Sequence, residues 1–350
     1  MKIAIIGTGG IANWHAGRFT KMKGVSVVAC CDIIPEKAKA FAEKWKIPRR
    51  YTDYRELLEK EDLDAVSVAA VDSAHAPVSL AAVEKGRAVL CEKPMAVTLA
   101  DARKMRDAAL KKGVPNMINF SYRNSSAVQA ASKLIADGGI GRIIHIEASY
   151  LQSWLVQAAW GDWKTSSGWM WRLSRRHGSL GVLGDIGCHI YDMTSFLAGD
   201  FKSIACTLKV FDKGVPGNRS GEYVFDANDS FVSTVNFVNG GLGTVHSSRW
   251  ASGHINSLRN RIFGDKGAIE IDLDTSYDQF RIARGAKALE KANWQVVKCK
   301  PTPDNFQRFA DCVMKGKKDA SDFVNGVKVQ SYLHTSVLSD RFRKPVVVRF

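Results

Sequence analysis

An apolar run followed at once by closely spaced glycines opens the chain and constrains its fold more than any other feature. Residues 2–6, Lys-Ile-Ala-Ile-Ile, suit a strand buried on both faces of a parallel sheet. Gly7 permits a tight turn, Gly9 lets a phosphate approach the backbone, and Ala12 is small enough for the next helix to pack on the sheet. Because the N–H groups at that helix start attract anions, the segment predicts a dinucleotide-binding turn.

A second apolar strand at 25–31 ends in Asp32, about twenty residues beyond the glycines, where a ribose-binding acid is expected. Its carboxylate can accept hydrogen bonds from an adenosine ribose and would repel a 2′-phosphate, so the sequence favours NAD over NADP. An ordinary strand–turn–helix with an acidic cap is the alternative. Lys37, or the basicity of the chain, leaves NADP possible.

Composition sets the broad class. The length of 350 residues and the hydrophobic content of 45% predict a folded protein of two domains. We expect a cytoplasmic protein without a membrane partner, because the sequence has no run of membrane-spanning length and no signal-peptide pattern after Met1. The seven cysteines form no C-x-x-C pair and lie mostly in apolar segments, so we interpret them as reduced packing residues.

The formal net charge of +15 raises nucleic acid as a partner. The basic residues are scattered in short groups, at 49–50, 111–112, 175–176 and 315–318, rather than gathered in a stripe with aromatic residues. We therefore expect no nucleic-acid partner, and attraction of anionic cofactors is a sufficient explanation of the charge.

Strand and helix signals alternate over the first third of the chain. Further strands are predicted at 65–70, 88–91 and 117–120, and helices at 37–45, 77–84 and 99–111, with Asp53 capping a short helix around Leu57. This is a doubly wound βαβ pattern, and it predicts an α/β protein whose dinucleotide-binding Rossmann domain covers residues 1–122.

After residue 122 the pattern changes. A helix is predicted at 128–136, and alternating segments at 143–150, 203–211, 230–237 and 243–250 predict a large, open and mainly antiparallel sheet. We therefore expect residues 123–350 to form an α/β domain for substrate binding and oligomerisation.

Glu92-Lys93-Pro94 follows the predicted strand at 88–91, at the carboxyl end of the sheet, where ligands bind in doubly wound folds. Oxidation of a secondary alcohol needs a base within hydrogen-bond reach of the O–H group while hydride leaves the carbon atom. Lys93 is a candidate for this base, and an exposed surface ammonium is the alternative. Glu92 could accept a hydrogen bond from the nicotinamide ribose or amide.

Asp185 and His189 lie four residues apart, so they share a face if residues 185–197 form an α-helix. His189 would then donate or accept a proton, and Asp185 would orient a substrate hydroxyl or the imidazole. A capped helix with a buried histidine is one alternative. A metal site is another, but no third cluster of ligands is evident and we expect no metal.

Five of the nine tryptophans lie between Trp154 and Trp171. Aromatic faces can cover the C–H faces of a sugar ring while polar groups bind its hydroxyls. Packing of a loop or a subunit contact would use tryptophans equally well. The candidate substrate-binding residues are Gln152, Trp171, Arg172, Asp185 and His189.

Together these segments resemble the glucose–fructose oxidoreductase and inositol dehydrogenase family, Gfo/Idh/MocA, over most of the chain. The matching motifs are the N-terminal glycines, Ala65-Val66-Ser67-Val68 with His75, Cys91-Glu92-Lys93-Pro94, Ser121-Tyr122-Arg123, Trp171-Arg172 and Gly184 to Asp192. The Glu-Lys-Pro and Asp-x-Gly-x-His segments are the specific part of the resemblance.

The resemblance implies an NAD(P)-dependent oxidoreductase that transfers hydride between a secondary alcohol of a sugar, anhydrosugar or cyclitol and the nicotinamide. It further implies catalysis between the two domains and a homo-dimer or homo-tetramer. Its catalytic residues would be Lys93, Asp185 and His189. Its cofactor contacts would be Gly7, Thr8, Gly9, Gly10, Ile11, Asp32, His75, Glu92, Lys93 and Arg123.

Tyr150-Leu151-Gln152-x-Trp154 with the later Trp-x-Trp-Arg is similar to members that oxidise anhydrosugars such as levoglucosan. The chain departs from the family pattern at Ala70-Val71, where Thr-Pro is common, and at Ser179-Leu180-Gly181, where a glycine run is common. Two other functions fit the same motifs. One is an NAD-dependent glycoside hydrolase that uses transient oxidation, and the other is a non-catalytic dinucleotide-binding regulator.

Overall fold

The computed structural model describes the backbone of residues 1–350 and every side chain except that of Ser167. The chain divides into two compact units: unit 1 comprises Met1–Ser121 and Pro303–Gln330, and unit 2 comprises Tyr122–Thr302 and Ser331–Phe350. The predicted domains, 1–122 and 123–350, therefore differ from the units chiefly in one respect. Residues 303–330 return to unit 1.

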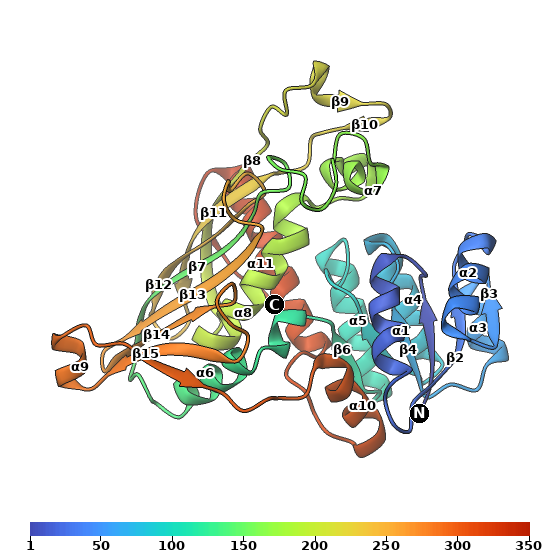
Figure 1. The fold of residues 1–350 in the computed structure, drawn as a ribbon, viewed down its shortest axis with the longest axis horizontal. Helices are drawn as coiled ribbons and strands as arrows, with labels where there is room; N and C mark the ends of the chain where they lie inside the picture. Colours follow the sequence, from blue (N-terminus) through green and yellow to red (C-terminus); the bar gives the residue numbers. More distant parts are fainter. The chain divides into compact units, whose positions relative to one another are not determined.

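Unit 1 is built on a parallel sheet with the strand order β3-β2-β1-β4-β5-β6 (Figure 1). The strands are β1 (Lys2–Ile6), β2 (Ser26–Cys31), β3 (Arg49–Tyr51), β4 (Ala65–Val68), β5 (Ala88–Cys91) and β6 (Asn116–Ile118). Both β4 and β5 are buried along their whole length, which explains their uninterrupted apolar sequences. The order changes direction between β1 and β4, the point where doubly wound sheets bind ligands, so the predicted Rossmann fold is confirmed.

Helices connect these strands as the sequence predicted. They are α1 (Gly10–Phe19), α2 (Pro35–Trp45), α3 (Tyr54–Lys60), α4 (Asp72–Glu84) and α5 (Leu99–Lys112). Pro35 stands in the first turn of α2, and the Asp53 carboxylate caps α3 by accepting a hydrogen bond from Arg55 N. Helix α4 starts at Asp72 rather than at residue 77, and Pro77 lies inside it.

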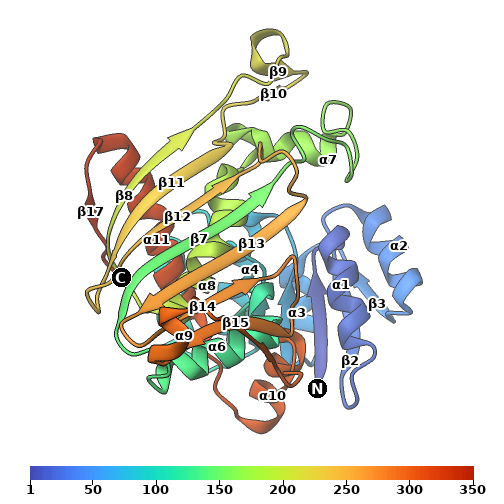
Figure 2. The ribbon, with the colours of Figure 1, turned by 60° about the vertical axis from the view of Figure 1, so that its left-hand side comes forward.

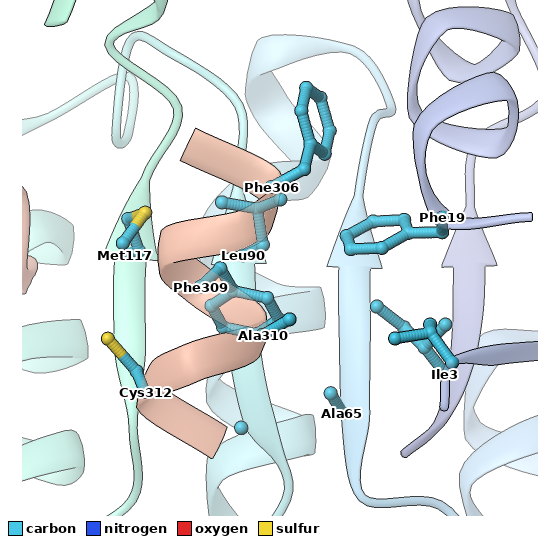
Figure 3. Packing of buried hydrophobic residues seen from close by; sticks show 11 residues of the cluster. Ile3, Phe19, Ala65, Leu90, Met117, Phe306, Phe309, Ala310 and Cys312 are labelled. Carbon is cyan, nitrogen blue, oxygen red and sulfur yellow. The ribbon is translucent and has the colours of Figure 1, made fainter. Parts of the chain in front are cut away.

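The return of residues 303–330 to unit 1 rests on the apolar face of α10 (Asn305–Lys315) (Figure 3). Phe306 and Phe309 are fully buried, and burial of one such ring stabilises a fold by about 2–3 kcal/mol. They pack in one cluster with side chains from β1, α1, β5 and β6, namely Ile3, Phe19, Leu90 and Met117. This packing is the physical reason why the second predicted domain is interrupted.

Unit 2 contains a long mixed sheet with the order β16-β15-β14-β13-β7-β12-β11-β8-β17 (Figure 2). Its strands are β7 (Ile143–Gln152), β8 (Phe201–Lys209), β11 (Ser230–Phe237), β12 (Leu242–Ser248), β13 (Asn256–Gly264), β14 (Gly267–Asp272), β15 (Gln279–Arg284), β16 (Gln295–Lys298) and β17 (Val346–Val347). Neighbouring strands are antiparallel except β7 and β12, which are parallel. The mainly antiparallel sheet is confirmed, although the sequence had not indicated β13 to β16.

One face of this sheet is covered by helices and the other is open. The covering helices are α6 (Ser126–Ala136), α8 (Cys188–Ala198) and the part of α11 (Phe323–Phe342) that belongs to unit 2 (Figure 2). On the open face, β11 alternates between buried and exposed residues, and Val232 and Leu242 are exposed. Arg261 of β13 bridges Glu147 of β7 and Glu270 of β14 on the surface.

The remaining α-helices and β-strands are short. They are α7 (Ser167–Met170), α9 (Ala286–Glu290) and the hairpin of β9 (Arg219–Ser220) and β10 (Tyr223–Val224). Among the described residues, no helix combines the length and the apolar character needed to cross a membrane.

Candidate active site

The turn after β1 has the geometry of an anion-binding loop. Gly7 has φ +89°, and a Cβ atom there would lie 2.5 Å from the Ala69 carbonyl oxygen, so the position accommodates only glycine. Around Gly9 and Gly10, by contrast, no described atom lies within 4 Å of such a Cβ. Within the described chain, no side chain caps α1 and no acidic residue stands in its first turn. The space and the N–H groups therefore fit a dinucleotide phosphate.

Asp32 lies at the end of β2 beside this loop. Its Oδ2 atom accepts hydrogen bonds from Thr8 N at 2.9 Å and Thr8 Oγ1 at 2.8 Å, and its Oδ1 atom accepts one from Ile34 N at 3.0 Å. A carboxylate has about four acceptor positions, so these bonds leave acceptor capacity for a ribose hydroxyl. Asp32 thus orders the glycine loop, which the sequence did not indicate, and its contact with a ribose stays a prediction.

Glu92 is buried, with 6% of its surface exposed. Its Oε1 atom lies 2.9 Å from His15 Nε2 and 2.6 Å from Asn119 Nδ2, and its Oε2 atom accepts a hydrogen bond from Lys93 N at 3.2 Å. Burial raises the pKa of Glu92, but the hydrogen bond and charge of His15, together with the charge of Lys93, outweigh burial and bring the pKa to about 2. The carboxylate is therefore held by partners within unit 1, and its contact with the nicotinamide stays a prediction.

His15 is a residue whose role the sequence analysis missed. It lies in α1 and is fully buried, with Nδ1 2.7 Å from Ser67 Oγ and Nε2 donating to Glu92. The ring thus joins α1, β4 and the end of β5. From the sequence, His15 could be placed only in the helix after the glycine loop. Nothing there indicated that its partner is Glu92, 77 residues away.

Lys93 belongs to the loop that follows β5, and His75 lies in the first turns of α4, which follows β4. Lys93 is half-buried, and its peptide bond to Pro94 is cis. His75 Nδ1 donates to the Pro94 carbonyl oxygen at 2.7 Å, and its Nε2 lies 3.2 Å from the Ala70 carbonyl oxygen. Buried His75 therefore links the loop after β5, which carries Lys93, to the loop after β4.

In unit 2, Asp185 lies in a π-helical turn, Leu183–Gly187, and α8 begins only at Cys188. The single α-helix predicted for 185–197 is corrected in this respect. Close packing requires glycine here, since a Cβ at Gly187 would lie 2.9 Å from the Phe231 ring. Glycine favours the α-helix less than most residues, and π-turns of this kind occur frequently at functional sites.

His189 is 6% exposed and packs among aromatic rings of unit 2. The Tyr122 ring meets it edge-on at a centroid distance of 4.9 Å, and the Tyr150 ring lies at 6.3 Å. The two tyrosine hydroxyls are hydrogen-bonded to each other, and Tyr150 donates to Asn256 Oδ1 at 2.8 Å. Burial raises the pKa of Tyr150 well above its usual value, so its hydroxyl stays protonated.

Gln152 is part of the same network. Its Nε2 group donates to Asn256 Oδ1 at 2.8 Å, and its Oε1 atom accepts from Trp154 Nε1 at 3.2 Å. The side-chain amide of Gln152 is buried, and its hydrogen-bond partners belong to unit 2. Asn256 lies on a strand that the sequence analysis had not predicted, which is why this residue was missed.

The tryptophan-rich segment 154–171 forms a core of its own. Trp154 and Trp163 are buried with Leu173 and Phe225, and partly buried Trp160 and Trp169 pack against them. Packing, the alternative use of these rings, therefore accounts for most of the cluster. At its edge the Arg172 guanidinium lies 5.1 Å from the centroid of the Trp169 ring and 4.6 Å from that of Trp171.

Arg249 forms an ion pair with Asp185 and was not singled out from the sequence. Its Nη2 group lies 2.9 Å from Asp185 Oδ2, and its Nη1 group donates to the Arg172 carbonyl oxygen at 3.1 Å. The side chain of Arg249 is wholly buried, whereas that of Asp185 is 30% exposed. No local motif distinguishes Arg249, because its partner lies 64 residues earlier.

Arg123, an expected cofactor contact, has a different environment. Its guanidinium donates to both oxygens of Asp192, at 2.8 and 2.6 Å, and it lies 4.1 Å from the centroid of the Phe196 ring. Both members of the ion pair are 2% exposed. The guanidinium thus holds α8 inside unit 2, and a contact of Arg123 with the cofactor stays a prediction.

Comparison with known proteins agrees with this architecture. Residues 1–120 match a family model described as an oxidoreductase family with an NAD-binding Rossmann fold, and residues 128–270 match the GFO/IDH/MocA C-terminal domain. Levoglucosan dehydrogenase of Pseudarthrobacter phenanthrenivorans is 28% identical over 276 residues, which cover 75% of this chain and 69% of that protein. The 1,5-anhydro-D-fructose reductase of Ensifer adhaerens is 32% identical over 248 residues, which cover 70% and 68%.

A solved structure of levoglucosan dehydrogenase in complex with NADH and levoglucosan superposes with a TM-score of 0.88 at 25% identity, and the match covers 100% of both chains. Inositol 2-dehydrogenase and D-glucoside 3-dehydrogenase are also among the relatives. The predicted fold, enzyme class and NAD-binding character are thereby confirmed. The chain belongs to the Gfo/Idh/MocA family of oxidoreductases, which includes sugar, anhydrosugar and inositol dehydrogenases.

Proposed function

We propose that this protein oxidises one secondary hydroxyl of an anhydrosugar, with levoglucosan as the first substrate to test, and transfers the hydride to NAD. The observation that supports NAD as the cofactor is the uncapped start of α1 beside Asp32. Support for the substrate half comes from the levoglucosan-binding neighbour, which matches over the whole chain, and from the aromatic segment 154–171.

The proposal assigns one task to each polar group. NAD, when bound, accepts the hydride. Lys93 holds or removes the proton of the reacting hydroxyl, and His189 is the second group able to exchange a proton. Asp185 accepts a hydrogen bond from a substrate hydroxyl and so orients the sugar. Arg172, at the edge of the tryptophan cluster, is a further donor for hydroxyls.

Preference for NAD over NADP is part of the proposal. A 2′-phosphate at the ribose site would meet the Asp32 carboxylate, and the adjacent Ile33, 84% exposed, offers no positive charge in return. Repulsion in a partly screened site is on the order of 1 to 3 kcal/mol, which corresponds to a preference of tenfold or more.

The decisive experiment follows absorbance of the reduced nicotinamide while a panel of anhydrosugars, pyranosides and inositols is offered with NAD and with NADP separately. We expect stoichiometric NADH with levoglucosan or a close analogue. Cleavage of a glycoside without net NADH would instead indicate the hydrolase. Absence of turnover across the panel, with NADH still bound, would indicate a regulator.

We further propose that the open face of the unit 2 sheet mediates a homo-oligomer. Its exposed apolar residues, such as Val232 and Leu242, lie on the same sheet as the surface ion pairs of Arg261, and a second copy packed about a two-fold axis would cover them. Light scattering at micromolar concentration should give a dimer or tetramer, and a monomer would refute this part. The cytoplasmic location stays a prediction.

A further inference from the structure

We propose that Arg249 is a positioning residue for Asp185, which fixes the direction of that carboxylate and ties it to the tryptophan-rich segment. This inference rests on the proposed function, because it concerns the aspartate assigned to substrate orientation. It adds a residue that no sequence motif indicated.

The geometry of the guanidinium is the first argument. One terminal nitrogen of Arg249 donates to Asp185 Oδ2 at 2.9 Å, and the other donates to the Arg172 carbonyl oxygen at 3.1 Å. The planar group also lies 5.0 Å from the centroid of the Trp154 ring. A rigid fork that binds two acceptors and stacks on an aromatic ring fixes orientation in a way that a lysine ammonium cannot.

Burial is the second argument. The side chain of Arg249 has no exposed surface, whereas 30% of the Asp185 side chain is exposed. The arginine is therefore enclosed by protein, and the aspartate is the member of the pair that reaches solvent. Burial lowers the pKa of Arg249, and the nearby Asp185 opposes this effect. Because a buried cation without a counter-charge is strongly unfavourable, the fully buried arginine and the Asp185 carboxylate hold each other in place.

The backbone that carries Arg249 is itself held by a second ion pair. Arg249 N donates to the Asp229 carbonyl oxygen at 2.9 Å, and the Asp229 carboxylate lies 2.8 Å from Lys213 Nζ. Both Lys213 and Asp229 are completely buried. The support of Asp185 therefore extends from Arg249 through its backbone to the buried ion pair of Asp229 and Lys213.

A substitution to lysine separates positioning from charge. Arg249→Lys keeps the positive charge but cannot reach both Asp185 and the Arg172 carbonyl with the same geometry. We expect kcat/KM for levoglucosan to fall by about 10- to 100-fold, mainly through kcat, because displacement of an orienting group by about 1 Å has effects of this size. Affinity for NADH, measured by fluorescence, should stay unchanged. Arg259→Lys, in the surface pair with Asp272, is the matched control.

Chemical rescue tests the role directly. Guanidinium ion at millimolar concentration should restore part of the activity of Arg249→Ala and should leave Lys93→Met unchanged. Wild-type kinetics in Arg249→Lys, or loss of thermal stability without any loss of kcat/KM in the folded enzyme, would overturn the inference.

A second measurement keeps the inference testable if the wild-type enzyme turns over no substrate and the proposed function fails. Unfolding equilibria of Arg249→Met, Asp185→Asn and the double variant form a double-mutant cycle. Each substitution should raise the unfolding equilibrium constant. We expect the factor for the double variant to be smaller, by about fivefold or more, than the product of the factors for the two single variants. Independent, multiplicative effects would show that Arg249 does not hold Asp185.

Discussion

The buried contact between His15 and Glu92 makes the stability of unit 1 depend on pH. Glu92 has a pKa of about 2 in the folded chain against an ordinary value of 4.5. This difference corresponds to about 3 kcal/mol of stabilisation at neutral pH, since each pKa unit is worth about 1.4 kcal/mol. Because the folded-state pKa is lowered, the stabilisation is complete above about pH 5 and is lost as the pH falls from about 4.5 towards 2.

Glu92→Gln removes this ionisation while it preserves the shape of the side chain. We expect the variant to lose about 3 kcal/mol in free energy of unfolding at pH 7 and to show a flatter pH dependence below pH 5. The two proteins should converge as the pH approaches 2. Urea titrations followed by circular dichroism at pH 7, 5, 4 and 3 measure both effects.

Glu84→Gln, at an exposed position of α4, is the control and should change stability by less than about 0.5 kcal/mol. An equal loss for Glu92→Gln at pH 7 and at pH 3 would refute the reasoning, because the loss would then come from packing rather than from the ionised carboxylate. A wild-type protein whose stability does not change between pH 5 and pH 3 would refute it as well.

Three further predictions concern the remaining parts of the site. Lys93→Met should lower kcat by about 10²- to 10⁴-fold with little change in NADH affinity, because it removes the proton-transfer group, and steady-state kinetics with fluorescence binding check this. Asp32→Ser should reduce the ratio of kcat/KM for NAD to that for NADP by about tenfold, and an unchanged ratio would contradict the ribose assignment. Gly7→Ala should destabilise the protein by more than about 2 kcal/mol, since its Cβ would lie 2.5 Å from the Ala69 carbonyl oxygen at φ +89°, and thermal unfolding with Gly24→Ala as the exposed positive-φ control measures this.

The sequence predicted those parts of the fold that depend on local patterns. Strands β1, β4 and β5 are buried on both faces, so their continuous apolar runs are unambiguous. Gly7 and Asp32 could be assigned because a tight turn and an acid at the next strand end each need a particular residue type at a fixed spacing.

Contacts between distant segments could not be predicted in this way. Arg249 and His15 have no local feature that distinguishes them from arginines or histidines on a surface, and their partners lie 64 and 77 residues away. Glu92 was recognised as part of a motif, yet the motif gave no indication of its contacts with His15 and Asn119. The π-turn at Asp185 lies where Gly187 packs closely on Phe231 of β11, a contact between distant segments that the sequence does not indicate.

The return of α10 to unit 1 has a consequence for synthesis of the chain. The 181 residues of Tyr122–Thr302 separate the two parts of unit 1, and translation of that stretch takes roughly 10 to 40 s at 5–20 residues per second. During this time the newly made Rossmann sheet exposes the apolar surface around Phe19 and Leu90 that Phe306 and Phe309 later cover. Unit 1 is therefore completed only after most of unit 2 has been synthesised, and until then its sheet carries an exposed apolar face of the kind that favours aggregation.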